Sequence, residues 1–273
     1  MKVVLFCGGA GMRLRGYADD VPKPMVTIGS RPILWHLMKY YAHFGHKDFV
    51  LCLGYKGNSI KDYFLHYDES VSNDFVWSDG GKKIQFMNRD IDDWTITFVE
   101  TGASANIGER LKAVEPHLRG EEIFLANYGD GLSDLPLPVM LETFRQSDAV
   151  ASLLLVQPTA SFDIVASGSE GMVTDICALN RSDIWINGGF FIMRNEMFDY
   201  LGPGEELVRE PFQRLIENQA LLAYKYPGFW QCMDTFKDKQ RLEELSQGSA
   251  PWKVWNHAAG PKSRASELVP AAI

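Results

Sequence analysis

The sequence predicts an α/β fold, in which an open, mixed but mostly parallel sheet is flanked by helices and carries small β insertions. Three observations support this. Short apolar runs, typical of strands buried on both faces, occur at KVVLF and again at DFVLCLGY. Helical spacing of apolar residues separates them, and such alternation implies right-handed parallel crossovers. At 273 residues, the chain can bury a large core in one such domain.

The first helix is expected over RPILWHLMKYYAHFG, where Leu34, Leu37 and Tyr41 share one face. Pro32 suits its first turn, and Gly45 suits the left-handed end of a helix. A second helix is expected over NSIKDYFLHY, after the strand DFVLCLGY. The order strand, helix, strand, helix therefore opens the chain.

Residues 68–100 interrupt this order. KKIQFMN and WTITFVE alternate polar and apolar residues, which predicts antiparallel strands flanking a polar loop. The alternation resumes with a helix near 108–118, the strand EIFLANYGD, a helix near 137–147 and the strand AVASLLLVQP. Short strands, the segment WINGGFFIM and helices near 207–218 and 236–247 follow. We expect one domain over 1–255 and a surface tail over 256–273.

Charge and cysteine usage restrict the function classes. The 35 acidic and 27 basic residues give a formal charge of -8, so no diffuse attraction to nucleic acid or anionic membrane is expected. Any phosphate ligand must be held by a local cluster or a metal. The four cysteines show no CxxC spacing and favour a reducing compartment. The opening apolar run is too short for a signal, and AVASLLLV is far below the ~20 residues of a membrane span. We expect a cytoplasmic protein.

The first strand is followed by the glycine-rich CGGAGMRL. Leu14 stands where GxGxxG requires a third glycine, and GK[ST] is absent, which argues against a P-loop ATPase. Such glycines let backbone N–H groups approach a phosphate, although a plain tight turn also explains them. In PKP, two prolines stiffen the backbone around Lys23 and bias it toward an extended conformation. Arg13 and Lys23 together favour phosphate binding.

Two aspartates are candidate ligands of Mg²⁺. Asp130 lies between glycines just beyond a strand, at the end of the sheet where such folds bind ligands. Asp234 precedes a helix, so it either caps that helix or supplies a second carboxylate. Asp134 is expected to cap the helix that begins near 137. Gly108 and Arg110, at another helix start, offer a place for an anion or a base edge.

Several of these motifs, in this order, resemble those of the glucose-1-phosphate cytidylyltransferases, a branch of the sugar-nucleotide pyrophosphorylases. The likeness runs from residue 1 to about 255 and includes PKPMV, RPILWHLMKYY, YGDGLSD, WINGGFF and GFWQCMDT. The resemblance implies a Rossmann-like nucleotidyltransferase fold and a homo-oligomer, a hexamer in this branch. It also implies that CTP and a sugar 1-phosphate yield a CDP-sugar and pyrophosphate, with Mg²⁺ as cofactor.

The same resemblance implies residue roles. Arg13, Lys23 and Asp130 would be catalytic: Arg13 contacts the β- and γ-phosphates, and Lys23 neutralises the α-phosphate. Asp130 and Asp234 would hold Mg²⁺. The nucleotide would also contact Gly8, Gly9, Ala10, Gly11, Met12, Thr101, Gly108, Glu109, Arg110 and Gly129. The acceptor would contact Tyr128, Asn187 and Gly188.

Three departures from the branch concern specificity. GTR is GMR here, which places a thioether at Met12, and TGGR is IGER, which places Glu109 beside the expected cytosine site. UTP or dTTP therefore remains an alternative nucleotide. The REKP segment before WINGG has no counterpart, so the lysine that holds the sugar's phosphate is missing.

Arg181 and Lys225 are the candidate replacements for that lysine. An acceptor other than glucose 1-phosphate is one alternative. A non-catalytic protein that binds a nucleotide or a sugar phosphate is the other.

Overall fold

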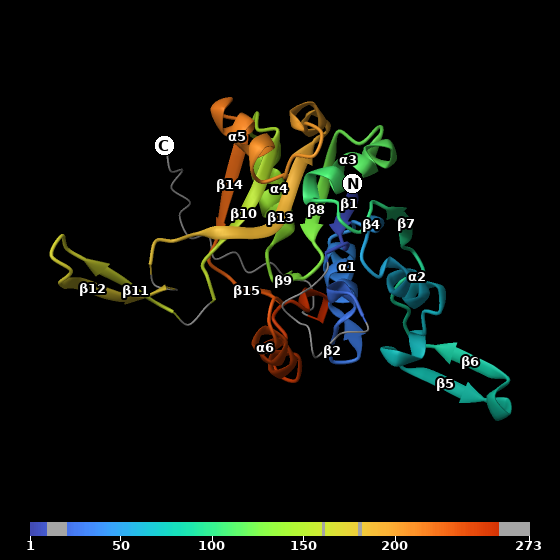
Figure 1. Ribbon diagram of the computed structural model, residues 1–273. Helices are drawn as coiled ribbons and strands as arrows, with labels where there is room; N and C mark the ends of the chain where they lie inside the picture. Colours follow the sequence, from blue (N-terminus) through green and yellow to red (C-terminus); the bar gives the residue numbers. More distant parts are fainter. Residues whose placement is uncertain (10–20, 160–161, 180–181, 257–273) are drawn as a thin grey trace.

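A seven-stranded sheet forms the centre of the computed structural model, which describes residues 1–9, 21–159, 162–179 and 182–256 (Figure 1). The strand order is β14-β10-β13-β8-β1-β4-β7. The strands are β1 Lys2–Phe6, β4 Asp48–Leu53, β7 Thr95–Glu100, β8 Ile123–Tyr128, β10 Ala151–Val156, β13 Ile186–Arg194 and β14 Leu221–Tyr226. β13 is antiparallel to both neighbours, and the other pairs are parallel. The expected mixed, mostly parallel sheet is confirmed.

Helices cover both faces of this sheet. The helices are α1 Ile33–His43, α2 Gly57–Leu65, α3 Ile107–Val114, α4 Leu137–Arg145, α5 Glu210–Glu217 and α6 Phe236–Ser246. Along β1, Val3 and Leu5 join the core cluster of α1, α2, α4 and α6, whereas Val4 and Phe6 join that of α3 and α5. Alternate residues of a strand point to opposite faces, so the continuous apolar run of β1 supplies both cores.

One expected strand pairing is wrong. β6 (Lys83–Phe86) pairs with β5 (Phe75–Ser78) in an antiparallel hairpin, and it does not pair with the strand over WTITFVE. That strand is β7, which runs parallel to β4 at the edge of the main sheet. The side chains of β7 are only partly buried or exposed. Its polar alternation therefore reflects an edge position.

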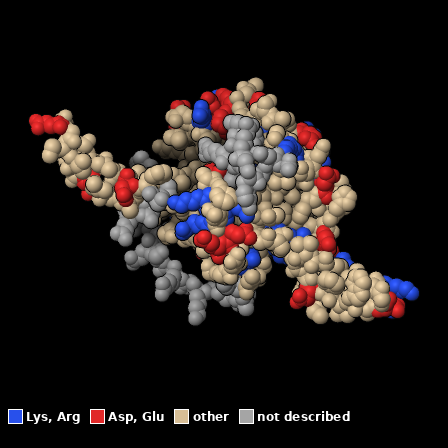
Figure 2. Space-filling model, turned by 60° about the horizontal axis from the view of Figure 1, so that its bottom comes forward, with Lys and Arg blue, Asp and Glu red and all other residues tan. Residues whose placement is uncertain are grey.

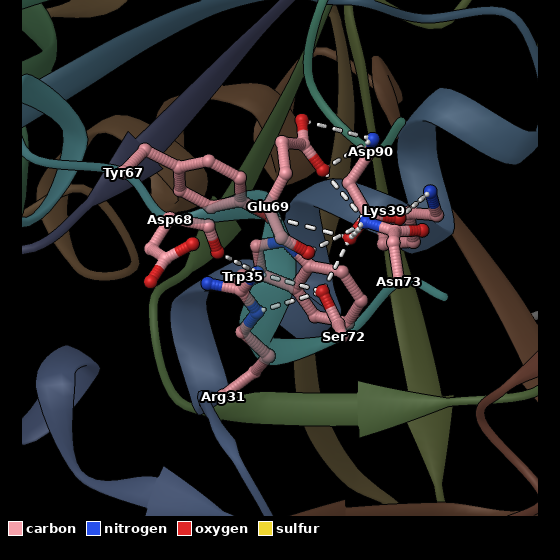
Figure 3. A network of polar contacts seen from close by, with 9 residues as sticks. All are labelled: Arg31, Trp35, Lys39, Tyr67, Asp68, Glu69, Ser72, Asn73 and Asp90. Atoms are coloured by element: carbon pink, nitrogen blue, oxygen red, sulfur yellow. Dashed lines mark hydrogen bonds and ion pairs between the residues drawn. The ribbon is translucent and has the colours of Figure 1, made fainter. Parts of the chain in front are cut away.

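A polar network joins the base of the β5–β6 insertion to α1 (Figure 3). The Arg31 guanidinium is buried, donates to the Ser72 hydroxyl at 2.7 Å and lies over the Tyr67 ring. Lys39 of α1 pairs with Asp90 at 2.7 Å, and Asp90 also accepts from Ser72 at 2.6 Å. The insertion is thus held by charge-assisted bonds, which are stronger than neutral ones.

A second hairpin, β11 (Asp163–Ser167) and β12 (Val173–Ala178), projects from the opposite side of the molecule (Figure 1). Both hairpins expose apolar side chains, among them Trp77 on one and Ile176 on the other, each 63% exposed. All four cysteines are free. Across the described residues, no helix is both long enough and apolar enough to span a bilayer. The expected tail lies outside the described residues, apart from Asn256.

Candidate functional site

Two carboxylates meet because a short ladder joins distant parts of the chain. β9 (Gly131–Ser133) pairs antiparallel with β15 (Trp230–Cys232). Asp130 directly precedes β9, and the Met233 N–H donates to its carbonyl at 2.9 Å, which extends the ladder by one step. Asp234 follows. An antiparallel ladder places the start of one strand beside the end of the other, so Asp130 and Asp234 lie together.

Lys23 lies between these carboxylates. Its ammonium group forms ion pairs with both Asp130 and Asp234. The Lys23 side chain is 14% exposed, compared with 24% for Asp130 and 41% for Asp234. Burial alone would lower the pKa of Lys23, but attraction and hydrogen bonds from Asp130 and Asp234 outweigh it and raise the pKa above the usual value. The ammonium group therefore stays charged, and the structure brings Lys23, Asp130 and Asp234 together.

The backbone around Lys23 differs from the expectation. Lys23 begins a 3-10 helix, η2 (Lys23–Met25), and is not extended. The N–H of Met25 donates to the Pro22 carbonyl at 2.8 Å, and Pro24 occupies an early helical position, where a missing N–H costs no hydrogen bond. The sequence predicted a stiff, extended backbone around Lys23. The structure stiffens it by a closed 3-10 turn instead.

The trio lies in a cleft of about 470 Å³ at the carboxyl ends of β1 and β8. This is where open α/β sheets bind ligands. The cleft is lined by Phe6, Gly8, Gly9, Lys23, Pro24, Ala105, Asn106, Ile107, Arg110, Tyr128, Gly129, Asp130, Glu206 and Asp234.

Arg110 forms the floor of this cleft beneath the glycine loop. It is 3% exposed and donates to the carbonyls of Gly8 at 3.1 Å and Leu53 at 3.2 Å, and to the Thr101 hydroxyl at 2.7 Å. A Cβ at Gly8 would stand 2.0 Å from the Arg110 guanidinium, and one at Gly54 would stand 2.7 Å away. The glycines are required here by a buried cation, and Thr101 positions Arg110 without lining the cleft.

The start of α3 is closed by its own side chains. The Asn106 side chain accepts from the Glu109 N–H, and Glu109 accepts from the Asn106 N–H, each at 2.9 Å. This capping box accounts for Glu109, which does not line the cleft. Gly108 also lies outside the lining, and it packs against the Glu205 backbone, since a Cβ at Gly108 would stand 2.2 Å from the Glu205 carbonyl oxygen. Glu109 and Gly108 are therefore scaffold positions in this structure.

Tyr128, Asn187 and Gly188 were expected to contact the acceptor, but only Tyr128 lines the first cleft. There, burial and the nearby Glu206 carboxylate raise the pKa of Tyr128 to about 12. The Gly188 carbonyl accepts from the Trp230 indole at 2.8 Å, and the Asn187 side chain accepts from the backbone two residues on. Glu206 was not anticipated, because an acidic residue in a polar loop has no distinguishing sequence context.

The expected role of Asp134 as a helix cap is wrong. α4 begins after Pro136, which provides no side-chain cap. Asp134 instead accepts from the Tyr226 hydroxyl at 2.6 Å and the Phe229 N–H at 2.9 Å. Burial raises the pKa of this carboxyl above its usual value. It ties the chain before β15 to the chain after β9, and so supports the ladder.

A second cleft, of about 660 Å³, meets the first at Asp234, which lines both. It is lined by Pro158, Thr159, Phe162, Ile186, Trp230, Gln231, Cys232, Asp234, Thr235, Lys237, Asp238, Gln240, Arg241 and Glu244. One wall is a face of α6, which carries Lys237 and Arg241. Figure 2, which views the molecule with the lower side of Figure 1 turned forward, shows basic and acidic side chains gathered near the middle of that side. Neither Lys237 nor Arg241 was anticipated.

Other sequence-predicted positions either line neither cleft or fall outside the described residues. Lys225 projects from β14 over the Trp185 ring at 5.1 Å and lines neither cleft. Ala10, Gly11, Met12, Arg13 and Arg181 lie outside the described residues. Asp234 does not cap α6, because Thr235 is the N-cap and forms a capping box with Asp238. Within the described residues, no group of three or more potential metal-binding side chains gathers, so any divalent ion here would depend on the Asp130–Asp234 pair.

Comparisons with known proteins agree with this geometry. A family model described as nucleotidyl transferase matches residues 2–238. Glucose-1-phosphate cytidylyltransferases from Salmonella typhi and Salmonella typhimurium are each 38% identical, over 93% of this chain and the full length of the relative. A solved UDP-glucose pyrophosphorylase in complex with UDP-glucose shares the fold, with a TM-score of 0.66 at 16% identity, over 90% of this chain and 98% of that one.

Proposed function

We propose that this chain, which belongs to the nucleotidyl transferase family, transfers CMP from CTP to the phosphate of a sugar 1-phosphate. The products would be a CDP-sugar and pyrophosphate. One observation carries the proposal: Lys23, Asp130 and Asp234, from three separate segments, converge in a cleft at the carboxyl end of the sheet.

The charge of this trio favours a divalent cation. One ammonium group and two carboxylates sum to a formal charge of -1, which would repel a triphosphate. Two carboxylates together with phosphate oxygens and water match the donors that Mg²⁺ prefers. Asp130 and Asp234 would hold the ion. When bound, Mg²⁺ would neutralise phosphate charge as a Lewis acid.

The reaction requires little covalent chemistry from the protein. An oxygen of the acceptor's phosphate forms a bond to the α-phosphorus, the bond from that phosphorus to the bridging oxygen of the β-phosphate breaks, and its electron pair leaves with pyrophosphate. Because the phosphate monoester is already a nucleophile, no general base is needed. Catalysis is then alignment and neutralisation of charge, for which Lys23 supplies a fixed cation.

The floor of the cleft supports nucleotide binding. Arg110 is a buried cation, and in the described part of the chain it contacts backbone carbonyls and a hydroxyl but pairs with no carboxylate. Burial lowers its pKa somewhat, yet guanidinium groups remain charged. Its uncompensated charge at the cleft floor would attract the phosphates of CTP, and Arg13 is proposed to act with it.

The chain is also proposed to form a homo-oligomer. Both hairpins extend from the sheet and expose β-branched and aromatic residues, among them Val76, Trp77, Val165 and Ile176. Exposed apolar surface of this kind marks association sites. Sedimentation velocity would detect the assembly, and a monomer at micromolar concentration would contradict it.

The central experiment combines purified protein, CTP, Mg²⁺ and glucose 1-phosphate, and measures pyrophosphate release. Release that requires all three components supports the proposal. UTP and dTTP in place of CTP test the base, and other phosphorylated sugars test the acceptor. Tight CTP binding by calorimetry without release from any pair would instead indicate a non-catalytic binding protein.

A further inference from the structure

We propose that the phosphate of the acceptor substrate is bound by Lys237 and Arg241, two basic side chains on one face of α6. This inference rests on the proposed function, because it names the site of the second substrate in that reaction. The ligand class is a phosphate monoester of a polyhydroxy compound.

The spacing on α6 places four side chains on one wall. Lys237, Gln240, Arg241 and Glu244 are three or four positions apart, and residues so spaced are neighbours on a helix surface. All four line the second cleft. A rise of about 6 Å separates residues four positions apart, so Lys237 and Arg241 occupy successive turns. They can therefore contact different oxygens of one phosphate group or adjacent parts of one ligand.

The position of this wall relative to Asp234 suits the acceptor. Asp234 lines both clefts and is three residues from Lys237. The attacking oxygen must reach the α-phosphorus beside Lys23, so the acceptor's phosphate must lie where the two clefts meet. For a ligand that enters along the α6 wall, Lys237 is the basic residue nearer to this junction in the sequence, and Arg241 is the farther one.

Two of the acidic groups that line this cleft, Asp234 and Asp238, have other partners. Asp234 pairs with Lys23. Asp238 accepts from the Thr235 N–H at 2.8 Å and from the Asp234 N–H at 3.1 Å. Arg241 makes no ion pair with any residue that the structure describes, and this includes Glu244. Of the two basic side chains, Arg241 is therefore the one whose charge the described residues leave without an ion-pair partner.

The rest of the cleft matches a carbohydrate. Trp230, Ile186 and Phe162 supply apolar surface, which suits the C–H face of a sugar ring. Gln240 and Glu244 supply groups that bind hydroxyls. An apolar lining with a few convergent polar groups is the usual composition of a small-molecule site.

The test is kinetic and uses glucose 1-phosphate as the acceptor. We expect Lys237→Ala and Arg241→Ala each to raise the KM for glucose 1-phosphate roughly ten- to hundredfold, the effect of one lost charge-assisted bond. The KM for CTP should stay unchanged. Lys239→Ala is the control, because it removes the same charge from α6 outside the cleft, where Lys239 pairs with Glu243. Unchanged acceptor KM in both cleft variants, or an equal rise in the control, overturns the proposal.

Failure of the proposed function would be seen separately, as no pyrophosphate release by the wild type. The acceptor site is then tested by calorimetric titration of glucose 1-phosphate alone. Weaker binding by Lys237→Ala and Arg241→Ala than by Lys239→Ala supports the site. Equal binding by all three, or no binding by the wild type, overturns it.

Discussion

The two clefts that meet at Asp234 differ in how they present charge. In the proposed nucleotide cleft, Arg110 is buried and bonds to backbone carbonyls, and the partly buried Lys23 pairs with two carboxylates. In the acceptor cleft, Lys237 and Arg241 are exposed on a helix surface. Burying a charge is costly unless it is paired and hydrogen-bonded, whereas long charged side chains at a surface keep their charged ends in water. The proposed nucleotide cleft thus holds its cations through internal partners, whereas the proposed acceptor cleft presents them at the surface.

Among the substitutions that test this difference, removing Lys23 should have the largest effect on activity. Lys23→Ala leaves two carboxylates with no ammonium group between them, at the position where charge develops in the reaction. We expect pyrophosphate release to fall by about 10²–10³-fold or more, as when one fixed donor to a transition state is lost. The assay is initial velocity at saturating CTP, with circular dichroism as the check on folding. Near-normal velocity in a folded Lys23→Ala protein would show that Lys23 does not neutralise phosphate charge in the reaction.

Asp130→Asn should come next. The change keeps the side-chain shape and removes the charge that would hold Mg²⁺ and that pairs with Lys23. We expect a higher Mg²⁺ requirement together with a lower maximal velocity, measured by titrating Mg²⁺ at fixed CTP. Asp234→Asn is the matched variant, with the smaller loss, because Asp234 is the more exposed of the two. Equal Mg²⁺ dependence in wild type and Asp130→Asn would contradict this.

Low pH should reduce the stability of the residues that pack behind the proposed acceptor cleft. His36 is 3% exposed; its Nδ1 accepts from the Trp252 indole at 3.3 Å, and its Nε2 bonds the Ile28 carbonyl at 3.0 Å. Trp252 stacks on Phe229, the residue before Trp230, which lines the second cleft. Burial lowers the pKa of His36 to about 4 from an ordinary value of 6.5, with smaller contributions from Lys253 and Arg31. The imidazole is therefore neutral in the fold.

Because the unfolded chain binds this proton more readily, His36 makes the free energy of unfolding fall as pH drops from about 6.5 toward 4. The full contribution is present above 6.5 and amounts to roughly 3 kcal/mol. Urea titrations at several pH values measure it. His36→Gln can keep both hydrogen bonds without titrating, and should flatten the curve. His46, whose pKa burial also lowers to about 4, remains in the variant and accounts for a residual slope. Identical curves would refute the assignment to His36.

Close packing of Gly8 against Arg110 predicts a smaller loss of stability on substitution of this glycine. Gly8→Ala places a Cβ 2.0 Å from the Arg110 guanidinium, so Arg110 must shift. We expect the free energy of unfolding to fall by roughly 1–3 kcal/mol, as for other overpacked sites. Gly9→Ala is the matched comparison, because no atom of the described residues lies within 4 Å of a Cβ there. Equal stability of the two variants would show that Arg110 is not held as described.

The smallest effect is expected at Glu109, whose capping role predicts a change in stability and none in base choice. Glu109→Ala should cost about 0.3–1.5 kcal/mol of stability, because it removes half of a capping box. The ratio of kcat/KM for CTP to that for UTP should stay at the wild-type value. A changed ratio would indicate that Glu109 contacts the base of the nucleotide.

The predictable parts were those marked by unusual local sequence. Glycines beside a buried strand, a lysine between two prolines and aspartates beyond strand ends pointed to the nucleotide cleft, and Lys23, Asp130 and Asp234 do converge there. The backbone conformation of Lys23 was wrong, because proline stiffens either an extended segment or a 3-10 turn.

What could not be predicted depends on non-local pairing or on orientation. The β9–β15 ladder joins two strands of three residues each, which are too short to show the alternation that predicts a strand. β7 looked like part of a hairpin because edge strands also alternate. Lys237 and Arg241 lie on a polar helix, where basic residues usually face solvent, so only the fold shows that their face lines a cleft.

The ladder also has a consequence for synthesis of the protein. Lys23 and Asp234 are 211 positions apart, so a ribosome-bound chain already presents Lys23 and Asp130 while Asp234 is still untranslated. Until β15 emerges, β9 has no partner strand and Lys23 faces a single carboxylate. A nascent chain therefore cannot assemble the complete pair of carboxylates before Asp234 has emerged from the ribosome, and a stop codon between Asp130 and Asp234 yields a product that lacks one of the two.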